Sequence, residues 1–442
     1  MLFRMQCLLL VLAACVALCA AKNPLATQDQ KALDELSLAL SKSPKLDDAR
    51  KTARDQYVRT LRKYKVLFSS QTWQDLDTTM EELVFSAVQK AVNNNPADPK
   101  VYWVDTAQRT HDWFDLQVRG GRYSYDNPDC FYRTVPISSH YTYKLHGRQI
   151  NGGVSDFSFS LISNPNSQNT VGAIYGKEMQ INDNGTYTIT INPSHSPGPN
   201  HLRSDFRAMQ IFARHNVGDW SKETPDELRI ELVEKPEHSK PFTNNTILRD
   251  AIENLKQSAF FYGFGALDFK TFTVPKNQLH APEQSQILGT LTSQAQSFGH
   301  YDLQDDEALV ATITKGKADY FVFPVYTVGM VTAAPRGHQV SLNDVQADQN
   351  NDGSYTFVIS NKDSGVYNWL DTVGRNQGTI MVRWQGLPTD GSGKKDLHAT
   401  ARVVKLDKLR STLPQETRFV SKDERQQLLQ ERAKQYDRLH FQ

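Results

Sequence analysis

The chain has 442 residues, of which 50 are basic and 49 acidic, and 22% are charged. This near-neutral balance argues against a protein whose affinity for nucleic acid or another polyanion comes from net charge. The length gives room for two or three domains with cores large enough to need no disulfide bonds.

The first 20 residues have the pattern of a secretion signal. Arg4 precedes an apolar run over residues 8–18, which is too short to span a bilayer. The sequence therefore predicts an exported, secreted chain without a membrane span. The alternative is a bacterial lipoprotein anchored through Cys15, which follows small residues. Cleavage of the signal would leave Cys130 as the one remaining cysteine, so no internal disulfide is expected.

Residues 27–96 are predicted to form a helical region. Apolar residues recur at helical spacing in three runs, and Pro44 and Pro96 mark the ends of the first and the third. The middle run, 47–66, is rich in arginine and lysine. Because acidic residues alternate nearby, the pattern favours a solvated face, with a membrane or nucleic-acid surface as the alternative.

From residue 101 the pattern changes to the period-two alternation of half-buried strands. The predicted fold is mainly β with accessory α, built from two tandem antiparallel β-sandwich or jelly-roll-like domains, an N-terminal helical region and a C-terminal helix. The expected segments are a first β domain over 101–236, a linker with one helix over 237–298, a second β domain over 299–410, and a C-terminal helical segment over 411–442. Within the last segment, a capping box at Ser421 marks the start of the helix.

Two stretches of the chain are copies of one another. Residues 183–191 and 351–359 run in step, with Gly185 and Gly353 168 positions apart in matching hairpin turns. At the same distance beyond each glycine comes Asn200-His201-Leu202 or Asn368-Trp369-Leu370. Residues 380–384 are similar to residues 210–214, with a one-residue shift in register. A match held in register over this length predicts a tandem duplication.

The motifs of the second copy also resemble a known family. They are Asn351 to Ile359, Asn368 to Thr372 and Arg383-Trp384, together with an Asn-Pro-Asp-x-x-Tyr element at 127–132 and an acidic element at 306–310. This set is similar to the signature of the domain-of-unknown-function family twelve-fourteen and covers about residues 99–437. The resemblance implies an antiparallel β domain with accessory helices, in a family whose activity and cofactors are not established.

The densest group of binding-type side chains lies in the second copy. It comprises Tyr367, Asn368, Trp369, Asp371, Arg375, Arg383 and Trp384. Aromatic rings beside amides, acids and arginines are suited to sugar recognition, because rings stack on C–H faces while polar groups bind hydroxyls. Core packing is the alternative. His201 stands where Trp369 does, which favours an exposed or half-exposed ring at 369 and a different ligand, if any, for the first copy.

Other motifs point to fewer chemistries. Residues 348–353 open like a calcium loop, but Ile359 stands where the closing acid is needed, so a hairpin turn is favoured over a non-helical calcium site. The chain has no His-x-x-x-His, Gly-x-Ser-x-Gly, Cys-x-x-Cys or phosphate-binding loop, and neither metal site nor cofactor is predicted. Asn184 and Asn244 lie in N-x-Thr sequons and are predicted glycosylation sites in a eukaryotic cell.

These features predict an exported protein that binds an extracellular ligand, with a glycan among the candidates, through the second β domain or the seam between the domains. A catalytic role is left undecided. One alternative is a secreted hydrolase or transferase that uses carboxylates, with Asp371, Asp306 and Glu307 as candidates. Another is a structural protein of an extracellular matrix.

Overall fold

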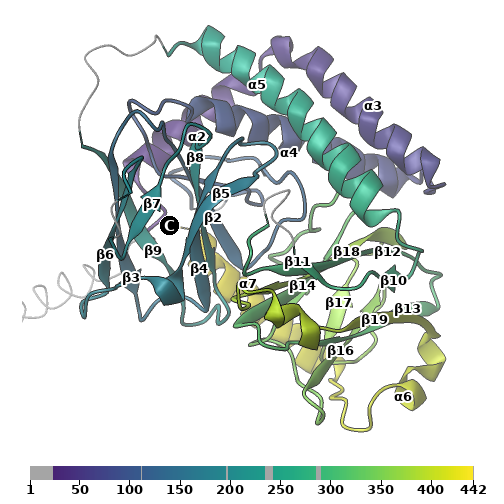
Figure 1. Ribbon diagram of the computed structural model, residues 1–442. Helices are drawn as coiled ribbons and strands as arrows, with labels where there is room; N and C mark the ends of the chain where they lie inside the picture. The colour runs from purple at the N-terminus through teal and green to yellow at the C-terminus, as the bar shows by residue number, and fades with distance from the viewer. Residues whose placement is uncertain (1–22, 111, 196–197, 234–241, 285–289, 442) are drawn as a thin grey trace, which may run out of the picture.

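A computed structural model describes residues 23–110, 112–195, 198–233, 242–284 and 290–441 (Figure 1). The predicted signal and Cys15 lie outside these ranges. The helices are α2 (Gln28–Leu40), α3 (Asp47–Lys63), α4 (Ser70–Val92), α5 (Asn244–Ser258), the π-helix η3 (Ala259–Thr271), α6 (Leu409–Thr412) and α7 (Lys422–His440). Short 3-10 turns are η1 (Pro44–Leu46), η2 (Gly176–Glu178), η4 (Ser392–Asp396) and η5 (Leu406–Lys408).

The predicted helical region is confirmed, and its helices begin where side chains cap them. The hydroxyl of Thr27 accepts a hydrogen bond from the Gln30 N–H at the start of α2, and the hydroxyl of Ser69 accepts one from the Thr72 N–H at the start of α4. α3, α4 and α5 pack together around a shared apolar core (Figure 1). This core extends to residues of the second β domain, such as Met381, so the helices are fixed against it.

The first β domain is a sandwich of two sheets. Its strands are β1 (Tyr102–Val104), β2 (Cys130–Pro136), β3 (Tyr143–Ile150), β4 (Asp156–Ile162), β5 (Thr170–Tyr175), β6 (Thr186–Asn192), β7 (His201–Arg203), β8 (Gln210–Asn216) and β9 (Thr224–Leu232). One sheet has the order β1-β2-β8-β4-β5 and the other β7-β6-β3-β9. Phe159 and Ile211 of the first sheet share one apolar core with Leu145 and Ile189 of the second.

The second β domain repeats this plan. Its strands are β10 (Gln278–Leu279), β11 (Glu283–Gln284), β12 (Ala295–Asp302), β13 (Glu307–Thr314), β14 (Tyr320–Tyr326), β15 (Ser341–Asn343), β16 (Ser354–Ser360), β17 (Trp369–Asp371), β18 (Gln377–Gln385) and β19 (Ala399–Lys405). One sheet has the order β10-β12-β18-β14-β15, with β11 also paired to β12, and the other β17-β16-β13-β19. The strand order is therefore the same in both domains: β2 to β9 correspond one by one to β12 to β19, and only the edge strands β1, β10 and β11 differ.

Contacts at the repeated turns match residue for residue. Gly185 and Gly353 both have positive φ, +80° and +85°, and each N–H donates to the carbonyl three residues before it. The side chain of Asn200 binds both backbone groups of Gln180, at 2.9 and 2.7 Å, and Asn368 binds those of Asp348 at 2.9 and 2.7 Å. The same strand order and the same hydrogen bonds at an offset of 168 positions confirm the internal repeat.

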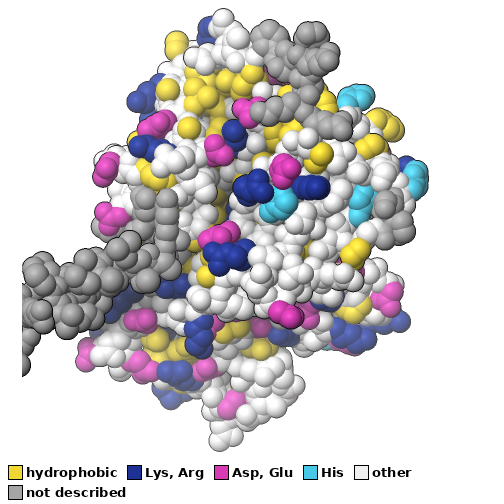
Figure 2. All heavy atoms as spheres, turned by 90° about the vertical axis from the view of Figure 1, so that its left-hand side faces the viewer, with side chains coloured by type: hydrophobic (Ala, Val, Ile, Leu, Met, Phe, Trp, Pro, Cys, Tyr) yellow, Lys and Arg dark blue, Asp and Glu magenta, His cyan; other side chains and the backbone are white. Residues whose placement is uncertain are grey.

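Helix α7 joins the two β domains across their common side. The Arg425 guanidinium donates to carbonyl oxygens of the second domain, and that of Arg438 donates to the Trp220 carbonyl of the first. The described residues include no helix long and apolar enough to cross a membrane. Acidic and basic side chains are interspersed on the outer face of the first domain (Figure 2), as in the pair Arg148 and Glu227.

Two features of this region differ from the expectation. The second β domain begins before residue 299, because β12 starts at Ala295 and two short strands precede it. The one helix expected in the linker is followed directly by the π-helix η3. Gly263 explains this continuation: a Cβ there would lie 2.8 Å from a ring carbon of Tyr57, so glycine allows η3 to pack closely on α3.

Candidate functional site

The centre strands of the two facing sheets, β8 and β18, meet at a seam between the domains. Their side chains alternate in direction, so Ile211 and Ala213 enter the first core while Val382 and Trp384 enter the second. The intervening residues of both strands face the seam. Asn216 donates to the side-chain carbonyl of Gln385 at 2.6 Å, which joins the two strands directly.

A cavity of about 70 Å³ lies beside this contact. Its walls are polar and aromatic and come from both β domains and from η3. The main lining residues are Asp105, Tyr123, Tyr125, Tyr132, Gln168, Phe212, Arg214, Tyr262, Ala266, Lys270, Gln294, Gln296, Phe298, Met381 and Arg383. We call it the seam cavity. By volume it holds about five positions the size of a water molecule.

Arg383 is the second domain's central contribution to the seam cavity. Its guanidinium donates to the Tyr132 hydroxyl at 2.7 Å and to the Tyr125 carbonyl at 3.0 Å, and its Nε–H has no hydrogen-bond partner among the described residues. Among the residues that the structure describes, no carboxylate oxygen lies within 4.0 Å of the Arg383 guanidinium. Burial disfavours its charge, but interactions with Tyr132 and Tyr326 outweigh burial and raise its pKa. The side chain is therefore a buried cation.

Arg214 is the matching residue of the first domain. It lies two positions before Asn216, as Arg383 lies two positions before Gln385. Its guanidinium donates to the Ser160 hydroxyl at 2.8 Å and lies 4.4 Å from the centre of the Phe212 ring. Burial lowers its pKa, yet an arginine stays charged at neutral pH. The repeat thus places one buried arginine from each copy at one cavity.

Asp105 adds a carboxyl group to the cavity wall directly after β1. Burial, and next the charge of Asp126, raise its pKa well above the usual value, so the neutral form is favoured. Its Oδ1 has no hydrogen-bond partner among the described residues. Lys90 lies behind the wall with its ammonium group 4.2 Å from the centre of the Tyr123 ring, and burial lowers its pKa to about 7.

The backbone near the cavity is strained at an aromatic residue. Tyr125 has a φ of +51°, a left-handed conformation that is unusual for a bulky side chain. Its N–H donates to the Met330 carbonyl at 2.7 Å, and this conformation presents its own carbonyl to Arg383. Such outliers cluster at binding sites because the surrounding structure must hold them in place.

Cys130 is a free, buried thiol at the start of β2. It packs with Tyr132 and Phe212 close to the cavity wall. Burial raises the pKa of the thiol to about 12, so the nucleophilic thiolate is strongly disfavoured at neutral pH.

Of the seven binding residues proposed from the sequence, Arg383 lines the seam cavity and the other six lie elsewhere. Trp384 is in the second core, and its Nε1–H donates to the Thr314 carbonyl at 2.8 Å. Arg375 pairs with Asp75 of α4 at 2.7 Å. Tyr367 lies under the guanidinium of Arg418, 4.0 Å from its ring centre.

The expectation of a half-exposed ring at Trp369 is wrong. The residue is 5% exposed, and its Nε1–H donates to the Ser360 hydroxyl at 3.0 Å. His201 makes the equivalent contact in the first copy, between Nε2 and the Asn192 side-chain oxygen at 2.9 Å. The histidine therefore preserves the ring-nitrogen contact of the repeat. Asn368 is likewise buried in backbone hydrogen bonds.

The three carboxylates considered for catalysis are separate from the cavity. Asp371 accepts from His338 Nδ1 at 2.7 Å, and this hydrogen bond raises the pKa of His338. Asp306 and Glu307 both contact the Lys405 ammonium group, at 2.9 and 3.2 Å. These ion pairs lie on the second domain away from the seam, and none of the three residues lines the cavity.

The calcium-like segment forms the expected hairpin turn. The Asp352 carboxylate accepts from the Ser354 N–H at 2.9 Å and from its hydroxyl, which uses this acid within the turn. Within the described part of the chain, no three histidine, cysteine, aspartate or glutamate side chains are grouped to hold a metal ion. The sequon asparagines Asn184 and Asn244 are both exposed.

Sequence reasoning missed most of the cavity residues. Tyr123, Tyr132 and Arg214 have no local signal of function, because strand alternation identifies a face but not what that face meets. One signal was available: the alignment of 380–384 with 210–214 pairs the arginines of the two copies once its one-residue shift is accepted.

Comparisons with known proteins support the fold. A scan of known protein families and a search of curated proteins both find no match. The chain is similar to the crystal structure of an uncharacterized protein from Burkholderia cenocepacia, with a TM-score of 0.69 and 22% sequence identity over 84% of this chain and 100% of that chain. A protein from Vibrio parahaemolyticus gives a TM-score of 0.42 at 10% identity, over 64% of this chain and 90% of that one, too distant to carry an argument.

Proposed function

We propose that this is an exported protein that binds a small anionic ligand in the seam cavity. The observation that carries the proposal is Arg383, a buried guanidinium with an unused Nε–H at the cavity and no carboxylate within 4.0 Å among the described residues. Burying a cation is costly unless a negative charge meets it. Arg122 offers the internal comparison, since it is equally buried but paired with Glu82 at 2.5 Å.

The other charges of the cavity agree with an anion. Arg214 adds positive charge to the wall, Lys270 is paired with Glu283 at 3.5 Å, and the raised pKa of Asp105 favours a neutral carboxyl there. A neutral Asp105 donates a hydrogen bond to an anionic oxygen instead of repelling it. The hydroxyls of Tyr123 and Tyr132 are further donors.

The volume limits the ligand to a compact anion. About five water-sized positions accommodate inorganic phosphate, sulfate or a short carboxylate such as oxalate. We no longer propose that a glycan stacks on Trp369, because a buried indole offers no free face to a sugar. We also propose that the chain is a member of family twelve-fourteen and that it is glycosylated at the exposed Asn184 and Asn244.

Isothermal titration of phosphate, sulfate, acetate and oxalate into the purified chain tests the proposal. Arg383→Met removes the guanidinium while keeping a long apolar side chain, and Arg402→Met alters an exposed arginine of β19 as the matched control. A hydrogen bond to a charged group contributes about 1.5–3 kcal/mol, so Arg383→Met should weaken binding by about ten- to a hundredfold. The control should bind as the wild type does.

The stability of Arg383→Met separates ligand binding from a structural role. Arg383→Met removes a buried cation that lacks a carboxylate partner, but it also leaves the Tyr125 carbonyl and the Tyr132 hydroxyl without their donor, so the two effects oppose each other and the melting temperature is expected to change little. A variant that unfolds readily, or one that binds each anion as tightly as the wild type, would assign Arg383 to the fold alone. Turnover of a bound carboxylate would instead favour the enzymatic alternative, with Asp105 as the candidate acid.

A further inference from the structure

The π-helix η3 has two distinct faces. A π-helix has about 4.4 residues per turn, so residues four or five positions apart share a face. Tyr262, Ala266 and Lys270 follow this spacing and line the seam cavity. Phe260, Phe264 and Phe269 follow it on another face and are exposed, at 59%, 43% and 66%. We call these three residues the phenylalanine stripe.

Two of the three rings of the phenylalanine stripe are in contact, and the third lies one helical turn further along. The rings of Phe260 and Phe264 stack with their centres 5.7 Å apart, and Phe269 follows one turn later. Single exposed apolar residues are common on soluble proteins, whereas several large ones along one helix face mark an interaction surface. Among the described residues, the five cavities identified are lined by side chains other than these three rings, which stand exposed on the outer side of η3.

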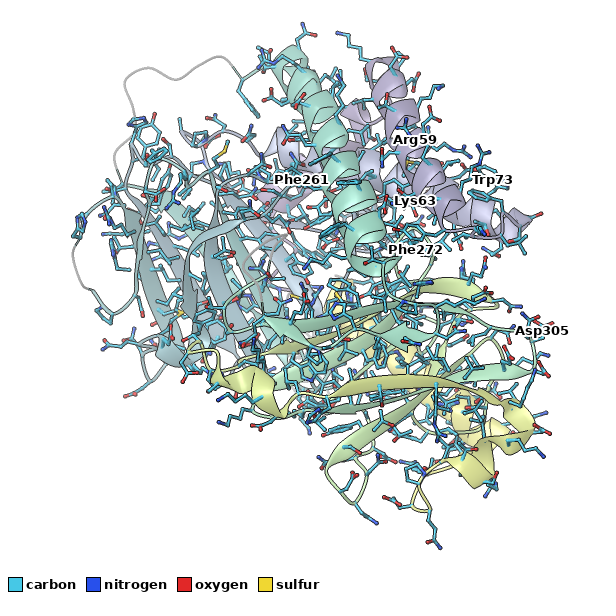
Figure 3. The ribbon with its side chains drawn as sticks, turned by 45° about the vertical axis from the view of Figure 1, so that its right-hand side comes forward. Arg59, Lys63, Trp73, Phe261, Phe272 and Asp305 are labelled. Atoms are coloured by element: carbon cyan, nitrogen blue, oxygen red, sulfur yellow. The ribbon has the colours of Figure 1, made fainter. Side chains whose placement is uncertain are left out.

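Basic side chains lie near the phenylalanine stripe. α3 runs alongside α5 and η3, and Figure 3 shows Arg59 and Lys63 on it. The Lys63 ammonium group lies 2.7 Å from the Asp268 carboxylate of η3 and stays 58% exposed, while Arg59 contacts Gln56, which packs on Gly263. Lys256 is exposed one turn before Phe260. Arg59 and Lys256 are therefore exposed cations near η3, whereas Lys63 is paired with Asp268.

We propose that the phenylalanine stripe binds the surface of an anionic phospholipid bilayer. Aromatic rings flanked by lysine and arginine suit this occupant, because the rings enter the headgroup boundary while the cations meet lipid phosphates. This inference rests on the outer face of η3 and is independent of the anion in the seam cavity.

Co-sedimentation with vesicles tests this surface. The full chain is mixed with vesicles of phosphatidylcholine alone or with phosphatidylserine added, and the triple variant Phe260→Ser, Phe264→Ser, Phe269→Ser is compared with it. Phe206→Ser, which alters an 88% exposed ring of the first domain, is the matched control. We expect the wild type and the control to bind the anionic vesicles, and the triple variant to bind at least about tenfold more weakly.

The charge and the fold are checked separately. Arg59→Gln with Lys256→Gln should weaken binding to anionic vesicles several-fold, and high salt should do the same. The triple variant should keep the far-ultraviolet circular dichroism of the wild type, because the three rings are exposed. Absence of vesicle binding by the wild type, equal binding by the triple variant, or a self-association that the triple variant abolishes without any vesicle binding would each overturn the proposal.

Discussion

Replacing Trp369 by alanine should destabilise the second β domain strongly. The indole is 5% exposed, lies 5.2 Å from the Arg425 guanidinium, and donates to Ser360. Truncating a fully buried tryptophan costs about 3–5 kcal/mol, through the lost transfer energy and the space left behind. We expect Trp369→Ala to lower the free energy of unfolding by this amount.

The repeat supplies a more specific version of the test. Trp369→Phe keeps a ring but loses the N–H donor, which should cost about 1–2 kcal/mol. The double variant Trp369→His with Ser360→Asn transplants the pair formed by His201 and Asn192 in the first copy, where the two side chains lie 2.9 Å apart. If the contact is a shared feature of the repeat, the double variant should be more stable than Trp369→His alone.

Urea denaturation followed by circular dichroism measures these differences without relying on tryptophan fluorescence. The expected order of stability is wild type, Trp369→Phe, then Trp369→Ala. A loss below about 1 kcal/mol for Trp369→Ala would refute the structural role derived from the buried indole. Equal stability of Trp369→His with and without Ser360→Asn would refute the equivalence of the two contacts.

Three further predictions follow from backbone geometry, burial and the free thiol. Gly185→Ala should cost more than Gly353→Ala in melting experiments, about 1–2 against about 1 kcal/mol, because both have positive φ but only at Gly185 does a Cβ come within 3.2 Å of a carbonyl oxygen. Burial lowers the pKa of His440 to about 3 from 6.5, so stability should fall as pH drops from about 6.5 toward 3, by at most roughly 5 kcal/mol, and His440→Phe should remove this slope in acid unfolding curves. Dithiothreitol should leave the melting temperature unchanged, and a thiol reagent should label Cys130 only after unfolding; labelling of Cys130 itself in the native chain, located by peptide mapping, would contradict its burial.

Local sequence patterns were sufficient for the elements and for the repeat. Alternation predicted the strands around Phe159, Ile189 and Ile359, and all three lie in sandwich cores. The Asn-Gly and Asp-Gly turns have positive φ at Gly185 and Gly353, as turns of this composition require. These features depend on neighbours close in the chain, which is why one sequence is enough to find them.

The seam could not be predicted in the same way. Arg383 and Tyr132 are 251 positions apart, and no periodicity links them. The close packing of η3 on α3 at Gly263 depends on Tyr57, which is more than 200 positions away in the chain and has no local signal near the glycine. The exposure of Trp369 could not be predicted from the tryptophan-to-histidine difference between the copies. That difference suggests a position without a packing role, but Trp369 and His201 make the same contact with the preceding strand.

The most direct test of an anion site at the seam is a crystal of the wild-type chain soaked in selenate, whose anomalous signal locates the ion. The account predicts a strong peak inside the seam cavity, within hydrogen-bond distance of Arg383 and Arg214, and its loss in Arg383→Met crystals treated in the same way. Selenate peaks confined to exposed lysines and arginines, with the cavity holding only water, would contradict it.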